Sequence, residues 1–188
     1  MKYKKHLVVL TSPSGGGKST VARYLLKTFS DMVFSVSATT RLKRPRELHG
    51  KDYYFLSKED FINKINNNEL VEFEEIFGNY YGTLKSSVSK AIEQDKLLLF
   101  DVDVKGALSI KKLYPEQSLL IFLMPPDIET LKIRLNKRGT ETEEQIQTRL
   151  SRAELEMSEK SKFDFVINNS VLDATLNNAE KIIRDNHI

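Results

Sequence analysis

The segment from Ser12 to Thr20 most constrains the fold, because three adjacent glycines stand in it between two apolar stretches. It reads Ser-Pro-Ser-Gly-Gly-Gly-Lys-Ser-Thr, follows the short apolar run Leu7 to Leu10, and leads into residues 21–26, where apolar side chains recur at helical spacing. Consecutive glycines let backbone N–H groups turn toward one point, and the positive end of the following helix adds to them. A strand, this loop and a helix in that order predict a P-loop that binds the phosphates of a nucleotide.

Two side chains in the loop carry the expected chemistry. Lys18 brings a mobile charge to the β and γ phosphates, and the hydroxyl of Ser19 is the expected Mg²⁺ ligand. Ser12 stands where the strict pattern has glycine, which a small side chain satisfies if its backbone φ is negative. The simpler alternative is a glycine-rich turn with an exposed lysine. The predicted ATP-binding residues of the loop are Ser12, Pro13, Ser14, Gly15, Gly16, Gly17, Lys18, Ser19 and Thr20.

Two carboxylates follow another apolar run, Leu97 to Phe100. Asp101 ends this run and Asp103 follows two residues later, so both leave the predicted sheet on the same side. Asp101 fits a carboxylate that approaches Mg²⁺, directly or through water, at the carboxyl edge of a strand. The alternative for this pair is a structural role as helix caps.

Apolar runs alternate with helix-like segments along most of the chain, which predicts an α/β fold with a parallel sheet covered by helices on both faces. One helix is expected to begin at Asp127, with an apolar stripe of Ile128, Leu131 and Leu135 that should face the sheet. Another begins near Glu143 and leaves its arginines free to reach outward. The predicted strands are Leu7 to Leu10, Val33 to Val36, Leu97 to Phe100, Leu119 to Leu123 and Phe163 to Ile167.

Residues 37–84 interrupt this alternation, since short strands at Tyr53 to Leu56 and Leu70 to Phe77 surround one helix. Ser57 begins a capping box for that helix, and Gly78-Asn79 marks a turn. We therefore expect residues 1–36 and 85–188 to form the P-loop core, with a lid at about 134–149. Residues 37–84 would be an inserted lobe of mixed α and β structure that is free to swing.

Composition excludes several classes of protein. The chain has 188 residues and a net charge of +3, which is too mild to indicate nucleic acid as a partner. Its longest apolar runs, such as Ser118 to Met124, are far below the roughly 20 residues of a membrane helix. Cysteine is absent, which excludes disulfides and thiolate metal sites and favours a cytoplasmic location. Nothing in the sequence indicates an oligomeric state.

The predicted lobe contains motifs that indicate more about the function than the P-loop does. Residues 37–41 read Ser-Ala-Thr-Thr-Arg, and Arg44, a Gly-x-Asp-Tyr segment ending at Tyr53, and Asn-Tyr-Tyr-Gly-Thr at residues 79–83 follow. With these motifs the chain resembles the guanylate kinases. The resemblance covers nearly the whole chain, since residues 138–142 and 166–168 also match. It implies ATP-dependent phosphorylation of GMP or dGMP in purine nucleotide metabolism, with Mg²⁺ as cofactor and ATP and GMP as small-molecule substrates.

The resemblance also implies roles for individual residues. The arginines and tyrosines of the lobe would hold the phosphate of GMP, while Ser37, Glu72 and Thr83 would read its guanine. The predicted GMP-binding residues are Ser37, Arg41, Arg44, Glu47, Tyr53, Glu72, Tyr81, Thr83, Asp101 and Asp103. The predicted catalytic residues are Lys18, Arg41, Arg134, Arg138 and Arg149, and Asn168 would lie near the adenine of ATP.

Simpler interpretations remain open at this point. Residues 41–46 would also fit a solvated basic loop, Arg134 and Arg138 an exposed basic face, and Glu72 an exposed residue of an acidic strand. Two other functions are open as well: a non-catalytic guanylate-kinase-like module that binds phosphorylated peptides, and a P-loop kinase for another small acceptor. The intact Gly17-Lys18-Ser19 argues against the first.

Overall fold

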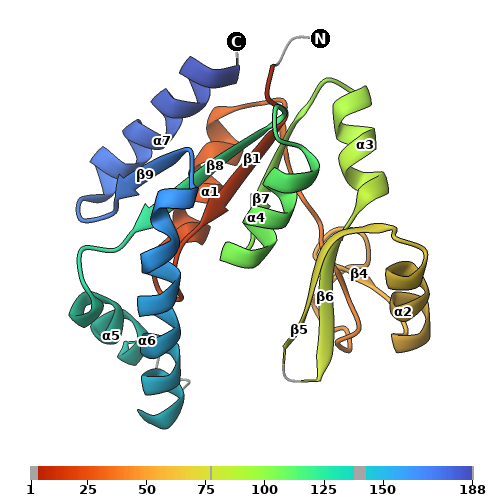
Figure 1. The fold of residues 1–188 in the computed structure, drawn as a ribbon, viewed down its shortest axis with the longest axis horizontal. Coiled ribbons are helices and arrows are strands. Elements are labelled where there is room, and N and C mark those ends of the chain that lie inside the picture. The colour runs from red at the N-terminus through yellow and green to blue at the C-terminus, as the bar shows by residue number, and fades with distance from the viewer. Residues whose placement is uncertain (1–3, 77, 138–142, 188) are drawn as a thin grey trace.

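The centre of the fold is a five-stranded sheet in which all neighbouring strands run parallel, in the order β2-β7-β1-β8-β9 (Figure 1). The structure is a computed structural model that describes residues 4–76, 78–137 and 143–187. Because the chain passes first to the β7 side of β1 and later to its β8 side, the carboxyl end of β1 is a topological switch point, where ligands bind in open α/β sheets. The strands are β1 (Leu7–Thr11), β2 (Met32–Phe34), β7 (Leu97–Asp101), β8 (Ser118–Met124) and β9 (Phe165–Asn168).

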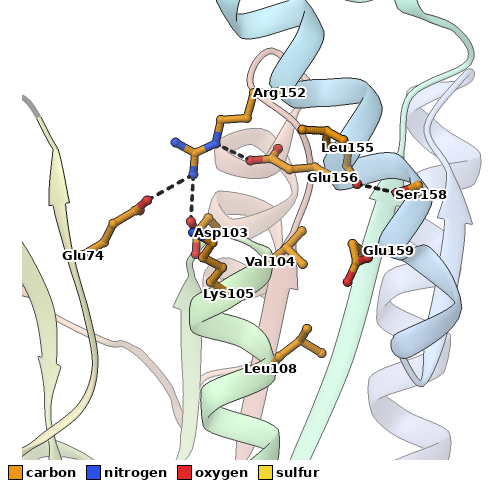
Figure 2. A pocket seen from close by; sticks show the side chains of 10 residues that line it. All are labelled: Glu74, Asp103, Val104, Lys105, Leu108, Arg152, Leu155, Glu156, Ser158 and Glu159. Atoms are coloured by element: carbon orange, nitrogen blue, oxygen red, sulfur yellow. Dashed lines mark hydrogen bonds and ion pairs between the residues drawn. The ribbon is translucent and has the colours of Figure 1, made fainter.

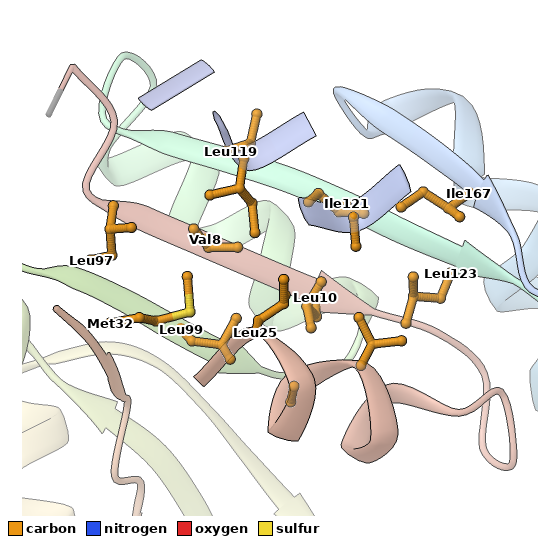
Figure 3. Close-up of a cluster of buried hydrophobic side chains, with 14 residues drawn as sticks. Val8, Leu10, Leu25, Met32, Leu97, Leu99, Leu119, Ile121, Leu123 and Ile167 are labelled. Atoms are coloured by element: carbon orange, nitrogen blue, oxygen red, sulfur yellow. The ribbon is translucent and has the colours of Figure 1, made fainter. Parts of the chain in front are cut away.

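Helices cover both faces of this sheet (Figure 1). Alternate residues of β1 belong to two separate apolar clusters: Val8 and Leu10 pack with α1 (Lys18–Thr28) and α7 (Leu172–His187), as Figure 3 shows. Leu7 and Val9 pack on the other face, which α3 (Lys85–Glu93) and α4 (Val104–Leu113) cover. Burial on both faces explains why these strands are unbroken apolar runs, and it confirms the predicted α/β class.

Residues of the predicted lobe form a second, four-stranded sheet in the order β4-β3-β6-β5. Here β5 and β6 are antiparallel neighbours, while β3 pairs in parallel with β4. Helix α2 begins after Ser57, whose side chain accepts a hydrogen bond from the backbone N–H of Asp60, as the capping pattern predicted. The elements are β3 (Ala38–Thr39), β4 (Tyr54–Phe55), α2 (Lys58–Asn66), β5 (Leu70–Ile76) and β6 (Asn79–Leu84).

The two sheets are joined through packed side chains as well as through the chain itself. Val71 of β5 is buried in the same cluster as Val104 and Ala107 of α4. The lobe also has a small core of its own around Phe61 and Ala38. The position of β5 against α4 therefore fixes where the side chains of the lobe lie relative to the large sheet.

One sequence prediction about the helices is wrong. The apolar stripe of α5 (Ile128–Asn136) does not face the sheet, because Leu131 and Leu135 pack against Ile146 and Leu150 of α6 (Glu143–Ser158). An apolar stripe specifies that a helix buries one side but not which partner covers it. A short 3₁₀ helix, Glu159–Lys162, then leads toward β9. None of the helices described is both long and apolar enough to span a membrane.

Candidate functional site

The glycine-rich loop lies at the carboxyl end of β1, and Gly17 is the residue that precedes α1. Gly15 and Gly17 have φ values of 84° and 94°, a region that favours glycine. Gly16 is required for another reason, since a Cβ atom there would lie 2.9 Å from the backbone carbonyl oxygen of Pro13 and would also clash with the Ser12 side chain. Ser12 itself has no positive φ, and its buried hydroxyl donates to the carbonyl of Pro13 at 2.9 Å. The loop thus accommodates serine where the strict pattern has glycine.

Lys18 and Asp101 meet beside this loop. The Nζ atom of Lys18 donates to the carbonyl of Ser12 at 2.8 Å and lies 3.8 Å from Oδ1 of Asp101. Burial raises the pKa of the Asp101 carboxyl, and the charge of Lys18 opposes that rise. Both side chains line a cavity of about 420 Å³, whose other walls are Pro13, Ser14, Gly15, Gly16, Gly17, Ser19, Thr20 and Arg23.

Ser19 and Asp101, the two residues predicted to hold Mg²⁺, both line this cavity. Oxygen ligands are those that Mg²⁺ prefers. Within the described ranges, no group of three or more His, Cys, Asp or Glu side chains is arranged to hold a metal ion.

The predicted lid arginines approach the loop from α5 and α6. Nη1 of Arg149 donates to Oγ of Ser14 at 2.8 Å, so this side chain reaches away from the apolar stripe of α6, as predicted. Nη2 of Arg134 lies 3.5 Å from the carbonyl of Asn169. Arg138, the third predicted arginine, lies outside the described residues.

Asn169 is a contact that the sequence analysis missed. Its Nδ2 donates to the carbonyl of Gly16 at 2.6 Å, while its Oδ1 accepts from the hydroxyl of Thr175 at 3.1 Å. The predicted residue, Asn168, ends β9 with an exposed side chain. Ile167 is buried, so the alternation of a strand would have placed Asn169 on the inner side and Asn168 on the outer side.

A second group of side chains belongs to the lobe. Nη2 of Arg41 donates to Oε1 of Glu47 at 2.7 Å, and its guanidinium carbon lies 5.4 Å from the ring centre of Tyr53. The Tyr53 ring contacts that of Tyr81 edge to face at 6.1 Å. The hydrogen bond from Arg41 holds the pKa of Glu47 below its usual range. Arg41 is therefore not a solvated surface charge, whereas the side chain of Arg44 is exposed and only its backbone N–H reaches Glu47, at 2.8 Å.

Glu72 lies on the lobe's sheet beside Thr83. The Thr83 hydroxyl donates to Oε1 of Glu72 at 2.7 Å, and burial raises the pKa of the Glu72 carboxyl, with the charge of Asp103 adding to the effect. The interpretation of Glu72 as an exposed strand residue is wrong. Ala38 pairs with Gly82 in the antiparallel ladder, and continuing this register by one residue places Ser37 opposite Thr83. The three residues predicted to read guanine thus come together.

Asp103 and Asp101 make different contacts. Its Oδ1 accepts from the backbone N–H of Gly106 at 2.8 Å and so caps α4. Its Oδ2 accepts from Nη2 of Arg152 at 2.8 Å. The helix-cap interpretation therefore holds for Asp103 and fails for Asp101, which faces Lys18 instead.

The two groups of side chains face one another across the carboxyl edge of the large sheet. Burial raises the pKa of the Tyr53 hydroxyl, and the neighbouring Tyr81 adds to this rise. A phosphate-binding loop on the central strand and a separate cluster of arginine and tyrosine donors opposite it are what a P-loop kinase for a small phosphorylated acceptor requires.

Comparison with known proteins shows which family of P-loop kinases this chain resembles. The family model for guanylate kinase matches residues 4–186, and the chain belongs to the guanylate kinase family. It is 52% identical over 167 residues to a guanylate kinase of Chlorobium luteolum, covering 89% of this chain and 85% of that one. With the guanylate kinase of Bacteroides thetaiotaomicron it shares 44% identity, over 95% of this chain and 88% of the relative. The crystal structure of guanylate kinase from Anaplasma phagocytophilum superposes with a TM-score of 0.76 at 34% identity, over 98% of this chain and 87% of that one.

Proposed function

We propose that this chain transfers the γ-phosphate of ATP to the phosphate of GMP, producing ADP and GDP. The observation that carries the proposal is the partly buried carboxylate of Glu72, which the hydroxyl of Thr83 holds in a lobe opposite the phosphate loop. Among the described residues, no cation pairs with this carboxylate. A buried acid without a cation is costly for the fold, so its presence at a site points to a ligand that supplies donors.

Guanine supplies the donors that fit. Its N1–H and its N2 amino group lie side by side, and one carboxylate can accept from both. Glu72 would take these two bonds, and the hydroxyls of Ser37 and Thr83 would serve the O6 acceptor. Adenine presents an acceptor at N1, which would meet the lone pairs of Glu72 and leave buried groups unpaired. Sites of this kind discriminate between substrates by about 10⁴ or more.

The phosphate of GMP would occupy the aromatic and cationic end of the lobe. Arg41 offers a planar fork to phosphate oxygens, its guanidinium lies over the ring of Tyr53, and that ring contacts the ring of Tyr81. The two tyrosine hydroxyls would add neutral donors. Arg44 is exposed and unpaired with Glu47 through its side chain, so it is available to the phosphate. The phosphate of GMP has a second pKa of about 6 and is largely ionised at neutral pH, so the acceptor needs no strong general base.

The donor side would hold ATP in the loop of residues 12–20, with its adenine near Asn168. Lys18 would contact the β and γ phosphates, and Arg134, Arg138 and Arg149 would balance charge on the transferring group. Ser19 and Asp101 would hold Mg²⁺, directly or through water, and the ion would neutralise phosphate charge when bound. Transfer then depends on keeping the acceptor oxygen and the γ-phosphorus in line and free of water, for which movement of the lobe and the lid is proposed.

Two parts of the proposal extend further from the contacts described. We propose that dGMP serves as a second acceptor, because the base-reading contacts do not involve the ribose. We also propose a role in purine nucleotide metabolism, because GMP is the proposed acceptor. A cytoplasmic location is proposed because the chain has no cysteine and so forms no disulfide. A phosphopeptide-binding module without catalysis would not need Lys18 beside a metal-site carboxylate, and the geometry of that pair favours the kinase.

A coupled assay for ADP formation tests this function. The wild-type chain is given ATP and Mg²⁺ with GMP, dGMP, AMP, CMP or UMP, and rapid turnover is expected with the guanine nucleotides alone. Glu72→Gln should lower kcat/KM for GMP by roughly 10- to 100-fold, as expected for losing a charged hydrogen-bond partner. Turnover of another nucleotide at the rate of GMP, or no turnover at all, would refute the proposal.

A further inference from the structure

Arg152 of α6 lies among three carboxylates that come from different parts of the fold (Figure 2). Its Nη2 donates to Oδ2 of Asp103 at 2.8 Å and lies 3.5 Å from Oε1 of Glu74, while its Nε donates to Oε1 of Glu156 at 2.8 Å. Glu74 belongs to β5 of the lobe, Asp103 precedes α4, and Glu156 is one turn further along α6. One guanidinium therefore connects strand β5 of the lobe, the start of helix α4 and helix α6.

The contact with Glu74 bears directly on Glu72. The two residues are separated by one position on β5, so their side chains leave the strand on the same side, and Phe73 between them points to the other. The Glu74 carboxylate points toward Arg152 and Asp103 (Figure 2). Burial raises the pKa of Glu74, and the charge of Asp103 adds to this rise. Holding Glu74 thus holds the stretch of β5 that carries Glu72.

The contact with Asp103 sets the space that Glu72 occupies. At Gly106, in the first turn of α4, a Cβ atom would lie 3.3 Å from Oε2 of Glu72 and 3.3 Å from Oδ1 of Asp103. Both carboxylates therefore approach the same glycine. Asp103 is fixed there through both of its oxygens, one by the cap of α4 and the other by Arg152.

We propose that Arg152 is a positioning residue for the guanine site: by binding Asp103 and Glu74 together, it holds β5 against α4 and so places the carboxylate of Glu72. This inference rests on the proposed function. In this proposal Arg152 acts through the two acidic residues and not by touching the substrates.

The neighbouring arginine of α6 gives the inference a specific consequence. Arg149, almost one turn earlier, reaches the phosphate loop at Ser14, while Arg152 reaches the acceptor side. Arg152 also borders a cavity of about 350 Å³ that Ser14 and Lys18 line, but its guanidinium bonds to the carboxylates of Asp103 and Glu156. Removing Arg152 should therefore affect GMP more than ATP. The side chain is half exposed and borders a cavity of about 500 Å³ rather than filling the core, so the variant is expected to fold.

Steady-state kinetics of Arg152→Ala with both substrates tests the proposal. KM for GMP should rise by about 3- to 10-fold, a moderate effect because the ion pairs are partly screened by water, while KM for ATP stays within about twofold. Arg152→Lys should recover part of the loss. In the Glu74→Gln background, Arg152→Ala should have a smaller effect than in the wild type, because the two residues act on each other.

Arg184→Ala is the matched control, since Arg184 is similarly exposed and also pairs with a glutamate one helical turn away, on the distant α7. It should change neither KM. An unchanged KM for GMP in Arg152→Ala, equal rises for GMP and ATP, or effects of Arg152 and Glu74 that simply add would overturn the inference. If Arg152→Ala fails to fold, Arg152→Lys and Glu74→Gln decide by the same split. A wild-type chain that does not turn over GMP would instead refute the proposed function, and this inference with it.

Discussion

The hydroxyl of Thr83 donates a 2.7 Å hydrogen bond to Oε1 of Glu72, and this bond only partly offsets the cost of burying the carboxylate. The pKa of Glu72 is raised because burial, together with the charges of Asp103 and Glu74, outweighs the bonds that favour the ionised form. The group proposed to read the base therefore destabilises the free protein when it is charged.

The first prediction concerns the stability of Glu72→Gln. A raised pKa in the folded state means that the stability contributed by this group is full below the unfolded pKa, about 4.3, and is lost as pH rises through the folded value. Glutamine removes that loss and can still accept from Thr83. Its Tm at neutral pH should thus exceed that of the wild type by about 2 to 4 °C, which corresponds to about 1 kcal/mol for a chain of this size.

Thermal unfolding of both proteins without ligand, at about pH 4 and pH 8, checks this prediction. The difference in Tm should shrink at the lower pH, where the glutamate of the wild type is protonated. A mutant that is less stable than the wild type at pH 8 would contradict the assignment of Glu72 as a buried acid without a cation.

The second prediction is a pH dependence of GMP binding. Only the carboxylate form of Glu72 can accept two hydrogen bonds from guanine, and its raised pKa brings protonation closer to neutral pH than for an ordinary glutamate. KM for GMP should therefore rise as pH falls below neutrality. The phosphate of GMP also titrates, near pH 6, so Glu72→Gln serves as the reference. The wild type should show the steeper rise, and parallel profiles would exclude a role for Glu72 ionisation.

The third prediction concerns Lys18, which lies beside the loop carbonyl of Ser12 and the carboxylate of Asp101. Lys18→Met should lower kcat by at least about 100-fold, the scale of losing one preorganised group that stabilises developing charge. Lys27→Met, on the exposed side of the same helix, should keep wild-type turnover. Circular dichroism would establish that both variants fold. Turnover close to that of the wild type in Lys18→Met would contradict the donor-site assignment.

The sequence predicted what depends on local patterns. The loop at residues 12–20, the cap at Ser57 and the buried strands follow from signals a few residues long, and the structure has each of them. The apolar stripe of α5 was placed on the wrong partner because its contact with α6 depends on the path of the chain between the two helices. Periodicity records how much of a helix is buried and carries no information about the element that covers it.

The candidate site shows the same limit. Glu72 and Thr83 are eleven residues apart and meet because the pairing of β5 with β6 places them opposite one another. The resemblance to a family assigned both residues to the guanine, and residue patterns alone did not. Arg152 was recognised as reaching outward, but its partners come from β5 and from the turn before α4. Contacts of this kind join three distant segments, and no spacing along the chain indicates them.

Asn169 is the clearest residue that the sequence analysis missed, and the last prediction tests it. Its buried side chain joins the carbonyl of Gly16 in the loop to the hydroxyl of Thr175 on α7. Its backbone carbonyl is also the group that Arg134 approaches at 3.5 Å. The residue that follows β9, the edge strand of the large sheet, thus holds the loop in place.

Asn169→Ala should therefore lower stability and weaken ATP binding together. Leaving the buried carbonyl of Gly16 without its donor costs about 1 to 3 kcal/mol, and a loop that is less well fixed should raise KM for ATP by about 5- to 20-fold, while KM for GMP changes less. Asn168→Ala is the comparison, because its side chain is exposed and its loss should leave Tm unchanged within about 1 °C. Unfolding curves of both variants separate the two asparagines, and ATP titrations of Asn169→Ala against the wild type measure the effect on the loop. If Asn169→Ala keeps the stability and the ATP KM of the wild type, the bond to Gly16 does not hold the loop in the form that binds the nucleotide.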